Sequence, residues 1–422
     1  MTRLLTAGVA AALFALVCSA SAADPAKSAD AKEFFFKPND RIVFLGDSIT
    51  EQYQYSSYIE LYLTTRFPDW NLTFINAGIG GDTANGGAGR FNAHVLDEHP
   101  TAVTINFGMN DGGYGKFRAD ACKNFTQKTE AMLKMAREAN VRVALLSPNA
   151  VDRRMKSNGV EYLETQKQFY APLAGAAEKF NYPFVDQYAI TRAATERMEK
   201  DDPKAQKAKP YGDGFHTSAP GGLLMAHAIL TGLHAPALVS NASIDVKDAK
   251  ATAKGCKVDD ITTFPNGVGV SFTRTDAALP LPMLKDWLPM LPYTNNLKDL
   301  NWYGLAVKGL PAGSFSVSID GKEVGKFSDK ELAAGVNLGN LTSGPLYDQS
   351  VAVLNAINDK NQIVHGRFRG IMLGGDKYWN TAAGRKRRPE EMARRLEEAT
   401  AAQAEIYKLA KPTAHKFEIK PQ

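Results

Sequence analysis

The stretch RIVFLGDSITEQ, residues 41–52, decides how the rest of the chain is interpreted. A run of apolar, strand-type residues leads directly into Gly46, Asp47 and Ser48. Taken alone, Asp47 and Ser48 indicate the cap of a following helix, because both residue types favour that position. The alternative is a serine nucleophile at the mouth of a parallel sheet, and the remaining sequence has to decide between the two.

Short apolar runs alternate with longer amphipathic segments from residue 41 to about residue 235. The candidate strands are RIVFLGD, NLTFINAG, AVTINFGM, VRVALLSP and YPFVDQY, with helix-like segments such as SYIELYLTTRF between them. Strands of this kind, spaced by helices, predict an α/β fold in which a five-stranded parallel sheet carries helices on both faces.

Polar or glycine-rich residues follow each of the first three strands, in the segments GDS, NAGIGGDT and FGMNDGG. Further along, the segment DGFHTSAPGG places Asp213 and His216 three residues apart. Because ligands of parallel sheets bind at the carboxyl ends of the strands, we expect the three strand ends to converge on one edge.

The blocks GDSI, NAGIGGDT, GMND and DGFH occur in the order of the signature blocks of the SGNH (GDSL-like) hydrolases, and the resemblance covers about residues 41–235. It implies a flavodoxin-like three-layer α/β/α fold and the hydrolysis of esters or thioesters. The oxyanion hole is then expected to consist of the N–H of Ser48, the N–H of Gly81 and the side-chain amide of Asn110. Gly81 is preferred over Gly78 and Gly80 because the donor in the family stands just before Asp-Thr.

The chemistry of these residues is consistent with that resemblance. A serine hydroxyl is a poor nucleophile until a base takes its proton. His216 can be that base for Ser48, and Asp213 can orient the imidazole and stabilise its protonated form. The sequence has no HExxH motif, cysteine cluster or Walker-type loop, so we predict no metal and no cofactor.

Other conspicuous residues are expected to be structural. Four histidines should pack or face solvent: His94, His99, His227 and His234. Two acids, Asp82 and Asp111, should brace their loops by hydrogen bonds from side chain to backbone. The basic run GRKRRPEEMARR is interpreted as a solvated helix face and not as a polyanion site. The aromatic pairs Trp302-Tyr303 and Tyr378-Trp379 are interpreted as core and not as platforms for sugar rings.

The first 22 residues, MTRLLTAGVAAALFALVCSASA, have the layout of a secretory signal, with cleavage expected after Ala22. Their apolar run is short for a membrane span; a retained anchor or a lipoprotein signal ending at Cys18 is the alternative. We therefore expect an exported protein, periplasmic or extracellular. Export leaves Cys122 and Cys256, which form either one disulfide or two separate thiols.

The chain of 422 residues divides into several expected parts. They are a signal peptide (1–22), a linker (23–40), an SGNH hydrolase domain (41–238), a β-rich accessory region (239–344) and a helical C-terminal region (345–422). The accessory region is expected to contain antiparallel strands, with a hairpin turn at Asp320-Gly321. The net charge of +5 argues against a dedicated nucleic-acid binder.

These features predict an exported serine esterase that works through an acyl-enzyme, and a carbohydrate O-acetylesterase in particular. Export argues against acyl-CoA substrates, and the strings FGMNDGG and FHTSAPGG are similar to blocks of polysaccharide acetylesterases. The expected partner is a small-molecule or polysaccharide ester, with no nucleic acid and no membrane segment after signal cleavage. A lipid-directed esterase or lysophospholipase, acyl transfer to a sugar, and a silent glycan-binding protein are the alternatives; the sequence does not indicate an oligomeric state.

Overall fold

The computed structural model describes residues 33–155, 160–339 and 341–422, so the predicted signal peptide lies outside the described residues. From residue 34 onward, the chain forms one unit. Its first sheet consists of parallel strands in the order β2-β1-β3-β4-β5. Their bounds are β1 Arg41–Gly46, β2 Thr73–Gly78, β3 Ala102–Asn106, β4 Arg142–Leu146 and β5 Phe184–Val185. This is the flavodoxin-like order, and each strand lies where the sequence predicted it.

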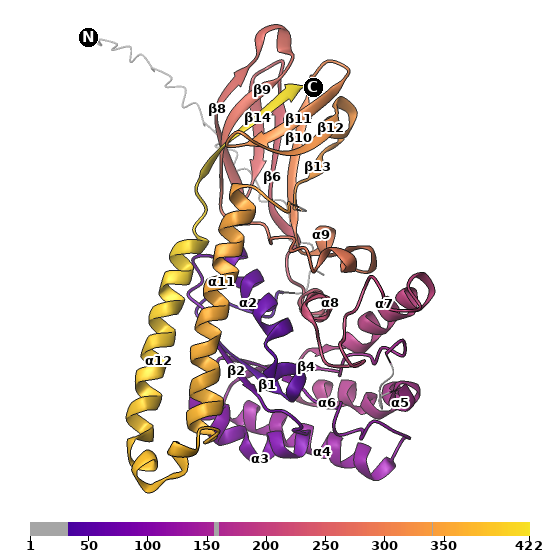
Figure 1. The fold of residues 1–422 in the computed structure, drawn as a ribbon, viewed down its shortest axis with the longest axis vertical. Helices are drawn as coiled ribbons and strands as arrows, with labels where there is room; N and C mark the ends of the chain where they lie inside the picture. Colours follow the sequence, from indigo (N-terminus) through magenta and orange to yellow (C-terminus); the bar gives the residue numbers. More distant parts are fainter. Residues whose placement is uncertain (1–32, 156–159, 340) are drawn as a thin grey trace, which may run out of the picture. The chain divides into compact units, whose positions relative to one another are not determined.

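Two layers of helices enclose this sheet. One layer contains α2 (Gln54–Arg66), α7 (Gln187–Asp201) and α8 (Ala219–Gly232), and the other contains α3 (Ala84–His94), α4 (Ala119–Glu138) and α6 (Pro172–Phe180). Figure 1 shows α2 and α8 on one side of the strands, with α3 and α4 on the other. The segment QKQFYAPLAGAAEKFN is divided between α5 (Val160–Tyr170) and α6, because Pro172 lacks the N–H that a continuous helix would need.

The first three strands end level with one another. Gly46 at the end of β1 pairs with Gly78 of β2 and with Asn106 of β3. The polar segments that follow the three strands therefore leave the sheet at the same edge, as predicted.

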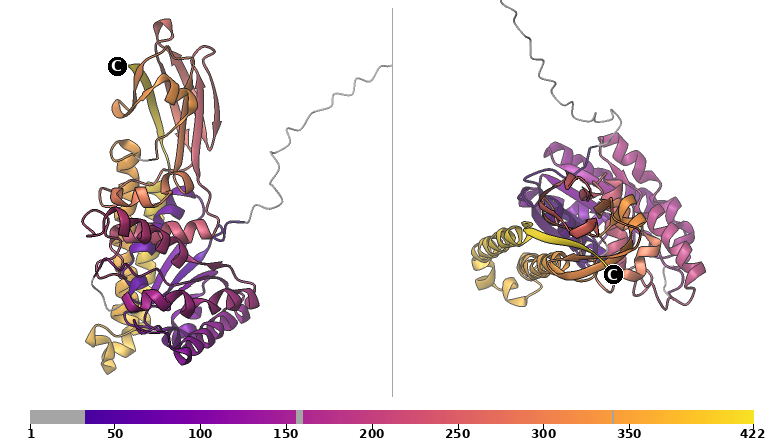
Figure 2. Two further views of the ribbon diagram at one scale, coloured as in Figure 1. Left: turned by 90° about the vertical axis from the view of Figure 1, so that its right-hand side faces the viewer. Right: turned by 90° about the horizontal axis from the view of Figure 1, so that it is seen from above.

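The β-rich region forms a sandwich of two sheets, in the orders β13-β10-β6-β7 and β12-β11-β14-β9-β8. Side chains from both sheets share one hydrophobic core, and Figure 2 shows the strands gathered in this part of the molecule. The bounds are β6 Leu238–Asp245, β7 Lys250–Lys254, β8 Cys256–Thr263, β9 Val270–Asp276, β10 Trp302–Lys308, β11 Ser314–Ile319, β12 Lys322–Ser328, β13 Val336–Asn337 and β14 Ala414–Pro421. The hairpin turn at Asp320-Gly321 is confirmed, with φ of 50° and 79°.

One expectation about this region is wrong. The strands were expected to be antiparallel, but β10 pairs in parallel with β6. The intervening chain forms β7, β8 and β9 and then the segment with η3 (Leu288–Tyr293) and α9 (Asn296–Asp299), so β10 re-enters the sheet in the direction of β6.

The C-terminal part is formed mainly by the long helices α11 (Pro345–His365) and α12 (Ala382–Ala410), which lie side by side (Figure 1). The short α10 (Asp329–Ala334) precedes them, and η4 (Gly366–Met372) and η5 (Lys377–Asn380) connect them. The side chains of Lys360 on α11 and Glu60 on α2 form a buried ion pair at 2.7 Å, which holds α11 against the hydrolase domain. The range 345–422 is not helical throughout, because β14 returns to the sandwich and pairs between β9 and β11.

Both cysteines of the described chain are free thiols, so the interpretation with two separate thiols is confirmed. Cys122 is buried and Cys256 is half-buried. Among the described residues, no helix is both long enough and apolar enough to cross a membrane.

Candidate active site

The turn after β1 serves as a helix cap and also presents a serine hydroxyl. The Asp47 carboxylate accepts the N–H of Ile49 at 2.9 Å, which caps the short helix α1 (Ser48–Glu51). A Cβ on Gly46 would lie 2.7 Å from the carbonyl oxygen of Asn106, so this close approach of strand and turn requires glycine. The structure shows Asp47 as the cap, and the same turn presents the hydroxyl of Ser48 next to it, so the cap does not conflict with the predicted nucleophile.

Ser48, His216 and Asp213 form a continuous hydrogen-bonded series. Ser48 Oγ lies 2.7 Å from His216 Nε2, and His216 Nδ1 lies 2.6 Å from Asp213 Oδ2. The second oxygen of Asp213 accepts the main-chain N–H of His216 at 2.9 Å. Burial raises the pKa of Asp213, but the hydrogen bonds from the ring and main chain of His216 outweigh burial and hold that pKa below its usual value. Asp213 therefore stays ionised beside the imidazole.

The loop that carries Asp213 and His216 is fixed by the segment that follows β4. The main-chain N–H of Asp152 donates to Gly214 O at 2.8 Å, and the side-chain amide of Asn149 donates to Phe215 O at 3.2 Å. These bonds position the histidine loop from the neighbouring strand end.

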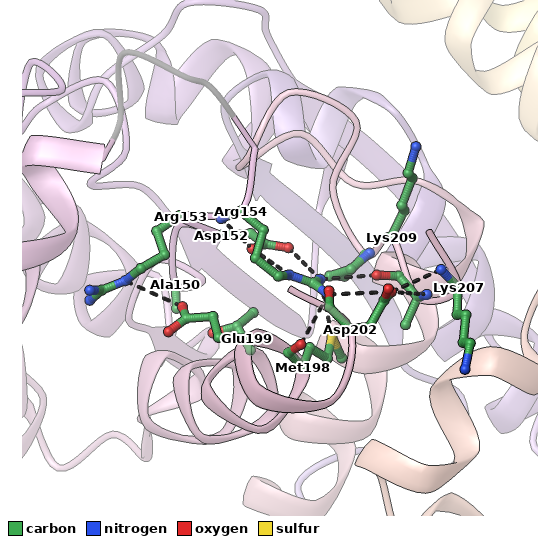
Figure 3. A network of polar contacts seen from close by, with 12 residues as sticks. Ala150, Asp152, Arg153, Arg154, Met198, Glu199, Asp202, Lys207 and Lys209 are labelled. Carbon is green, nitrogen blue, oxygen red and sulfur yellow. Dashed lines mark hydrogen bonds and ion pairs between the residues drawn. The ribbon is translucent and has the colours of Figure 1, made fainter. Parts of the chain in front are cut away.

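Arg154 anchors the chain that leads to this loop, through the contacts drawn in Figure 3. Its side chain is 2% exposed, and the guanidinium pairs with the carboxylate of Asp152, at 3.0 Å and 2.7 Å. It also donates to the carbonyl oxygens of Asp202 and Ala208, at 3.0 Å and 2.9 Å. The Asp202 carboxylate in turn accepts N–H groups of the chain that leads to the histidine loop, as Figure 3 shows for Lys207.

Two of the predicted oxyanion donors, Gly81 and Asn110, lie close together on the loops after β2 and β3. Gly81 has φ of +75°, a conformation that favours glycine, and its α-carbon faces open space. The side-chain amide of Asn110 donates to the carbonyl oxygen of Asp82 at 2.8 Å, so Asn110 lies against the segment that contains Gly81. Within the described part of the chain, no acceptor pairs with the main-chain N–H of Ser48 or of Gly81.

Tyr114 fixes the orientation of the Asn110 amide. The tyrosine hydroxyl donates to Asn110 Oδ1 at 2.5 Å, which leaves the two N–H groups of Nδ2 as donors. One of them reaches Asp82 O, and the other remains available to a ligand.

Glu51 connects the Gly81 loop to the C-terminal part of the chain. Glu51 Oε2 accepts the main-chain N–H of Gly80, the neighbour of Gly81. Glu51 Oε1 pairs with Arg369 Nε at 2.6 Å, and Arg369 belongs to η4, a π-helical segment. The exposed fractions of the two side chains are 19% for Glu51 and 39% for Arg369.

Buried acids support the turn beneath Ser48. Burial raises the pKa of Asp47 from 3.8 to about 7, assisted by the charges of Asp111 and Asp82 and opposed by the N–H of Ile49. Burial likewise raises the pKa of Asp111 to about 6, against hydrogen bonds from the N–H groups of Ala84 and Gly108. The structure thus confirms that Asp111 braces its loop.

Asp82 also has a structural role. Its carboxylate accepts the N–H of Thr83 at 2.9 Å and pairs with Arg90 Nε at 2.8 Å. Arg90 also donates to Gly46 O at 3.2 Å, so the loop after β2 and the turn before Ser48 share one guanidinium.

Most of the other residues that were expected to be structural have a structural role. His94 packs edge-on against Phe368, and His227 Nε2 lies 3.1 Å from Asp299 Oδ2. Tyr303 is fully buried in the sandwich, as expected, whereas Tyr378 is 39% exposed and does not belong to the core.

The basic run 384–395 lies on α12. There, Arg394 and Arg395 pair with glutamates of the same helix, which confirms a solvated face. In the described ranges, no group of three or more His, Cys, Asp or Glu side chains is arranged to hold a metal ion.

The sequence interpretation missed Glu51, Arg90, Tyr114, Arg154 and Arg369. Glu51 and Tyr114 lie close to the signature blocks in the sequence. That proximity is the one feature of the sequence that could have indicated a role at the site. No local sequence pattern predicts the roles of Arg90, Arg154 and Arg369, because these side chains act through contacts with segments that are distant in the sequence.

Comparison with known proteins agrees with this geometry. Residues 44–222 match the model of the GDSL-like Lipase/Acylhydrolase family. The domain belongs to this family. An arylesterase of Vibrio mimicus is 27% identical over 36% of this chain and 75% of its own length. Esterase TesA of Pseudomonas aeruginosa is 32% identical over 27% of this chain and 53% of its own length. The chain is therefore an ester hydrolase of the SGNH type.

One solved structure resembles the chain over nearly its whole length. A gut microbial diltiazem-metabolizing enzyme superposes with a TM-score of 0.77 at 24% identity, over 92% of this chain and 98% of the other. The likeness extends well beyond residues 44–222, so the hydrolase domain and the regions after it recur together as one fold.

Proposed function

We propose that this protein is an exported serine esterase in which Ser48 is the nucleophile, His216 the general base and Asp213 the residue that orients the imidazole. The observation that carries the proposal is the series from Ser48 Oγ through His216 to Asp213, with distances of 2.7 Å and 2.6 Å. A base within hydrogen-bond reach of a serine, itself oriented by a carboxylate, is the arrangement that activates such a nucleophile.

The reaction then proceeds in two halves. Ser48 Oγ attacks the carbonyl carbon of the ester while its proton passes to His216 Nε2. The tetrahedral intermediate expels the alcohol, which takes that proton, and the acyl group stays on Ser48. Water attacks the acyl-enzyme and gives a proton to Nε2; collapse releases the acid and returns the proton to Ser48 Oγ.

The oxyanion of each intermediate is stabilised by three donors: the main-chain N–H of Ser48, the N–H of Gly81 and the second N–H of Asn110 Nδ2. The main-chain donors have no competing acceptor in the described chain, and Tyr114 holds the Asn110 amide in the donor orientation. Removal of one such donor costs about 3–4 kcal/mol of transition-state stabilisation.

The proposed substrate is an acetyl ester on a carbohydrate. The secretory layout of residues 1–22 supports export to a compartment where glycans occur, and the strings FGMNDGG and FHTSAPGG resemble those of polysaccharide acetylesterases.

The test compares wild type with Ser48→Ala on p-nitrophenyl esters of increasing acyl length and on acetylated xylan. We expect hydrolysis confined to short acyl chains, acetate release from the polysaccharide, and loss of both in the variant. A fluorophosphonate probe should label wild type but not Ser48→Ala. Preference for long acyl chains would refute the acetylesterase, and labelling that persists in Ser48→Ala would refute the assigned nucleophile.

A further inference from the structure

A pocket of about 430 Å³ is lined by residues that follow Ser48 and His216 in the chain, and it has no role in the reaction described above. Its walls come from α2, α8, the segment that leads into η3, and α11. This volume falls within the range of about 300–1,000 Å³ that is usual for small-molecule sites. The helix α11 lies outside the residues that match the family model, so one wall of the pocket comes from the C-terminal region of the chain.

The pocket borders both the serine turn and the histidine loop. Gln52, which lines it, donates its main-chain N–H to Ser48 O at 3.1 Å. The side chain of Gln52 accepts the hydroxyl of Thr217 at 3.2 Å, and Thr217 directly follows His216. Ala219, three residues after His216, also lines the pocket. A ligand in the pocket would therefore lie next to an ester held at Ser48.

The chemistry of the lining residues is specific. Exposed amide side chains surround the pocket, from Gln52, Gln54, Asn358 and Gln362. Its floor is apolar and aromatic, formed by Tyr58, Leu223, Trp287 and Leu354. None of the described residues that line the pocket is charged.

This combination selects the kind of ligand. Side-chain amides offer a donor and an acceptor side by side, which matches neighbouring hydroxyl groups. Aromatic and aliphatic side chains suit the apolar face of a pyranose ring. Without a charged partner, an anionic or cationic ligand would lose hydration without compensation.

We propose that this pocket binds a neutral sugar unit of the alcohol part of the ester, next to the unit that carries the acyl group. The proposal rests on the function proposed above and assigns substrate selection to α11. The pocket is held in place by the buried Lys360–Glu60 pair and by Asn361, whose amide donates to Ser57 Oγ at 3.1 Å. Its wall is therefore formed before the ligand arrives.

The test measures binding in the Ser48→Ala protein, so that turnover does not interfere. Titration calorimetry and saturation-transfer NMR would follow neutral oligosaccharides of xylose, glucose, mannose and N-acetylglucosamine, with oligogalacturonate as the charged comparison. Asn358→Leu/Gln362→Leu removes two amides from the mouth of the pocket. Asn355→Leu, an exposed asparagine of the same helix that does not line the pocket, is the matched control.

We expect at least one neutral oligosaccharide to bind more tightly than oligogalacturonate. The double variant should weaken that binding about tenfold at an unchanged melting temperature, and Asn355→Leu should leave it within twofold. No binding by any neutral oligosaccharide, equal binding by the double variant, or an equal loss in Asn355→Leu would overturn the inference.

Hydrolysis of p-nitrophenyl acetate by the wild type reports separately on the proposed esterase. If the ester is hydrolysed but no sugar binds, the pocket inference fails alone. If sugars bind but no ester is hydrolysed, the proposed function fails; the pocket is then a sugar site, but its assignment to the alcohol part of an ester fails as well.

Discussion

The carboxylate of Glu51 joins the C-terminal part of the chain to the loop that carries Gly81, and its replacement by glutamine tests the proposed oxyanion hole. Glu51 accepts the N–H of Gly80 with one oxygen and pairs with Arg369 with the other. Glutamine has a single side-chain acceptor. If that oxygen keeps the bond to the N–H of Gly80, the amide nitrogen faces the guanidinium of Arg369. Both groups are then donors, so no hydrogen bond forms between them.

The size of the effect follows from the contact. A hydrogen bond to a charged group contributes about 1.5–3 kcal/mol, and the Glu51 side chain is four-fifths buried, so about 1–2 kcal/mol should remain after solvent screening. We therefore expect kcat to fall by about 5- to 30-fold, with KM little changed, because the donor acts on the oxyanion and not on the ground-state ester.

The assay is steady-state hydrolysis of p-nitrophenyl acetate by wild type, Glu51→Gln and Arg369→Gln. Arg369→Gln removes the outer partner but leaves the bond from Gly80 to Glu51, so its kcat should fall less than threefold. A kcat of Glu51→Gln within twofold of wild type would refute the positioning of Gly81 by Glu51. A larger loss in Arg369→Gln than in Glu51→Gln would show that the guanidinium acts by another route.

Three further variants test the supports of the site. Tyr114→Phe should lower kcat about 3- to 10-fold, because the Asn110 amide loses the bond that fixes its orientation; an unchanged kcat would contradict this. Asp47→Asn should stabilise the protein more at pH 8 than at pH 5. The folded-state pKa of Asp47, about 7, exceeds its unfolded value, so ionisation removes up to about 4 kcal/mol of unfolding free energy as the pH rises from about 4 to 7. Denaturant unfolding at both pH values measures the difference, and equal effects would contradict the shift. Arg154→Met should lower the unfolding free energy by about 3–5 kcal/mol, because a buried carboxylate loses its partner, whereas Arg394→Met on the solvated face of α12 should change it by less than about 1 kcal/mol. Equal losses in the two arginine variants would refute the role of the buried pair.

The fold of residues 41–238 could be predicted because its signals are local. Each strand of the parallel sheet is a short apolar run followed by a polar turn. Because the strands run in the same direction, these turns lie at one edge of the sheet. The residues Ser48, Asp213 and His216 lie in short blocks that resemble a known family, and the structure brings their side chains into one series.

The arrangement beyond residue 238 could not be predicted in the same way. The strand β14 pairs with β9 and β11, and β10 pairs with β6, across long stretches of intervening chain. Pairing of this kind depends on which edges remain open after the rest has folded, and a local alternation of apolar and polar residues does not encode it.

The residues that tune the site are divided between the two parts of the chain. The family model ends at residue 222, yet Arg369 reaches Glu51 and Lys360 reaches Glu60 from beyond that limit. The polar mouth of the pocket beside Ser48 is completed by α11. The proposed nucleophile, base and oxyanion donors therefore come from the shared domain, whereas the proposed wall for the alcohol part of the substrate comes from a region that the family model does not cover. Relatives that match only the shared domain are therefore useful for comparing the catalytic chemistry. We expect the preference for a particular ester to depend on the contacts of α11 and η4.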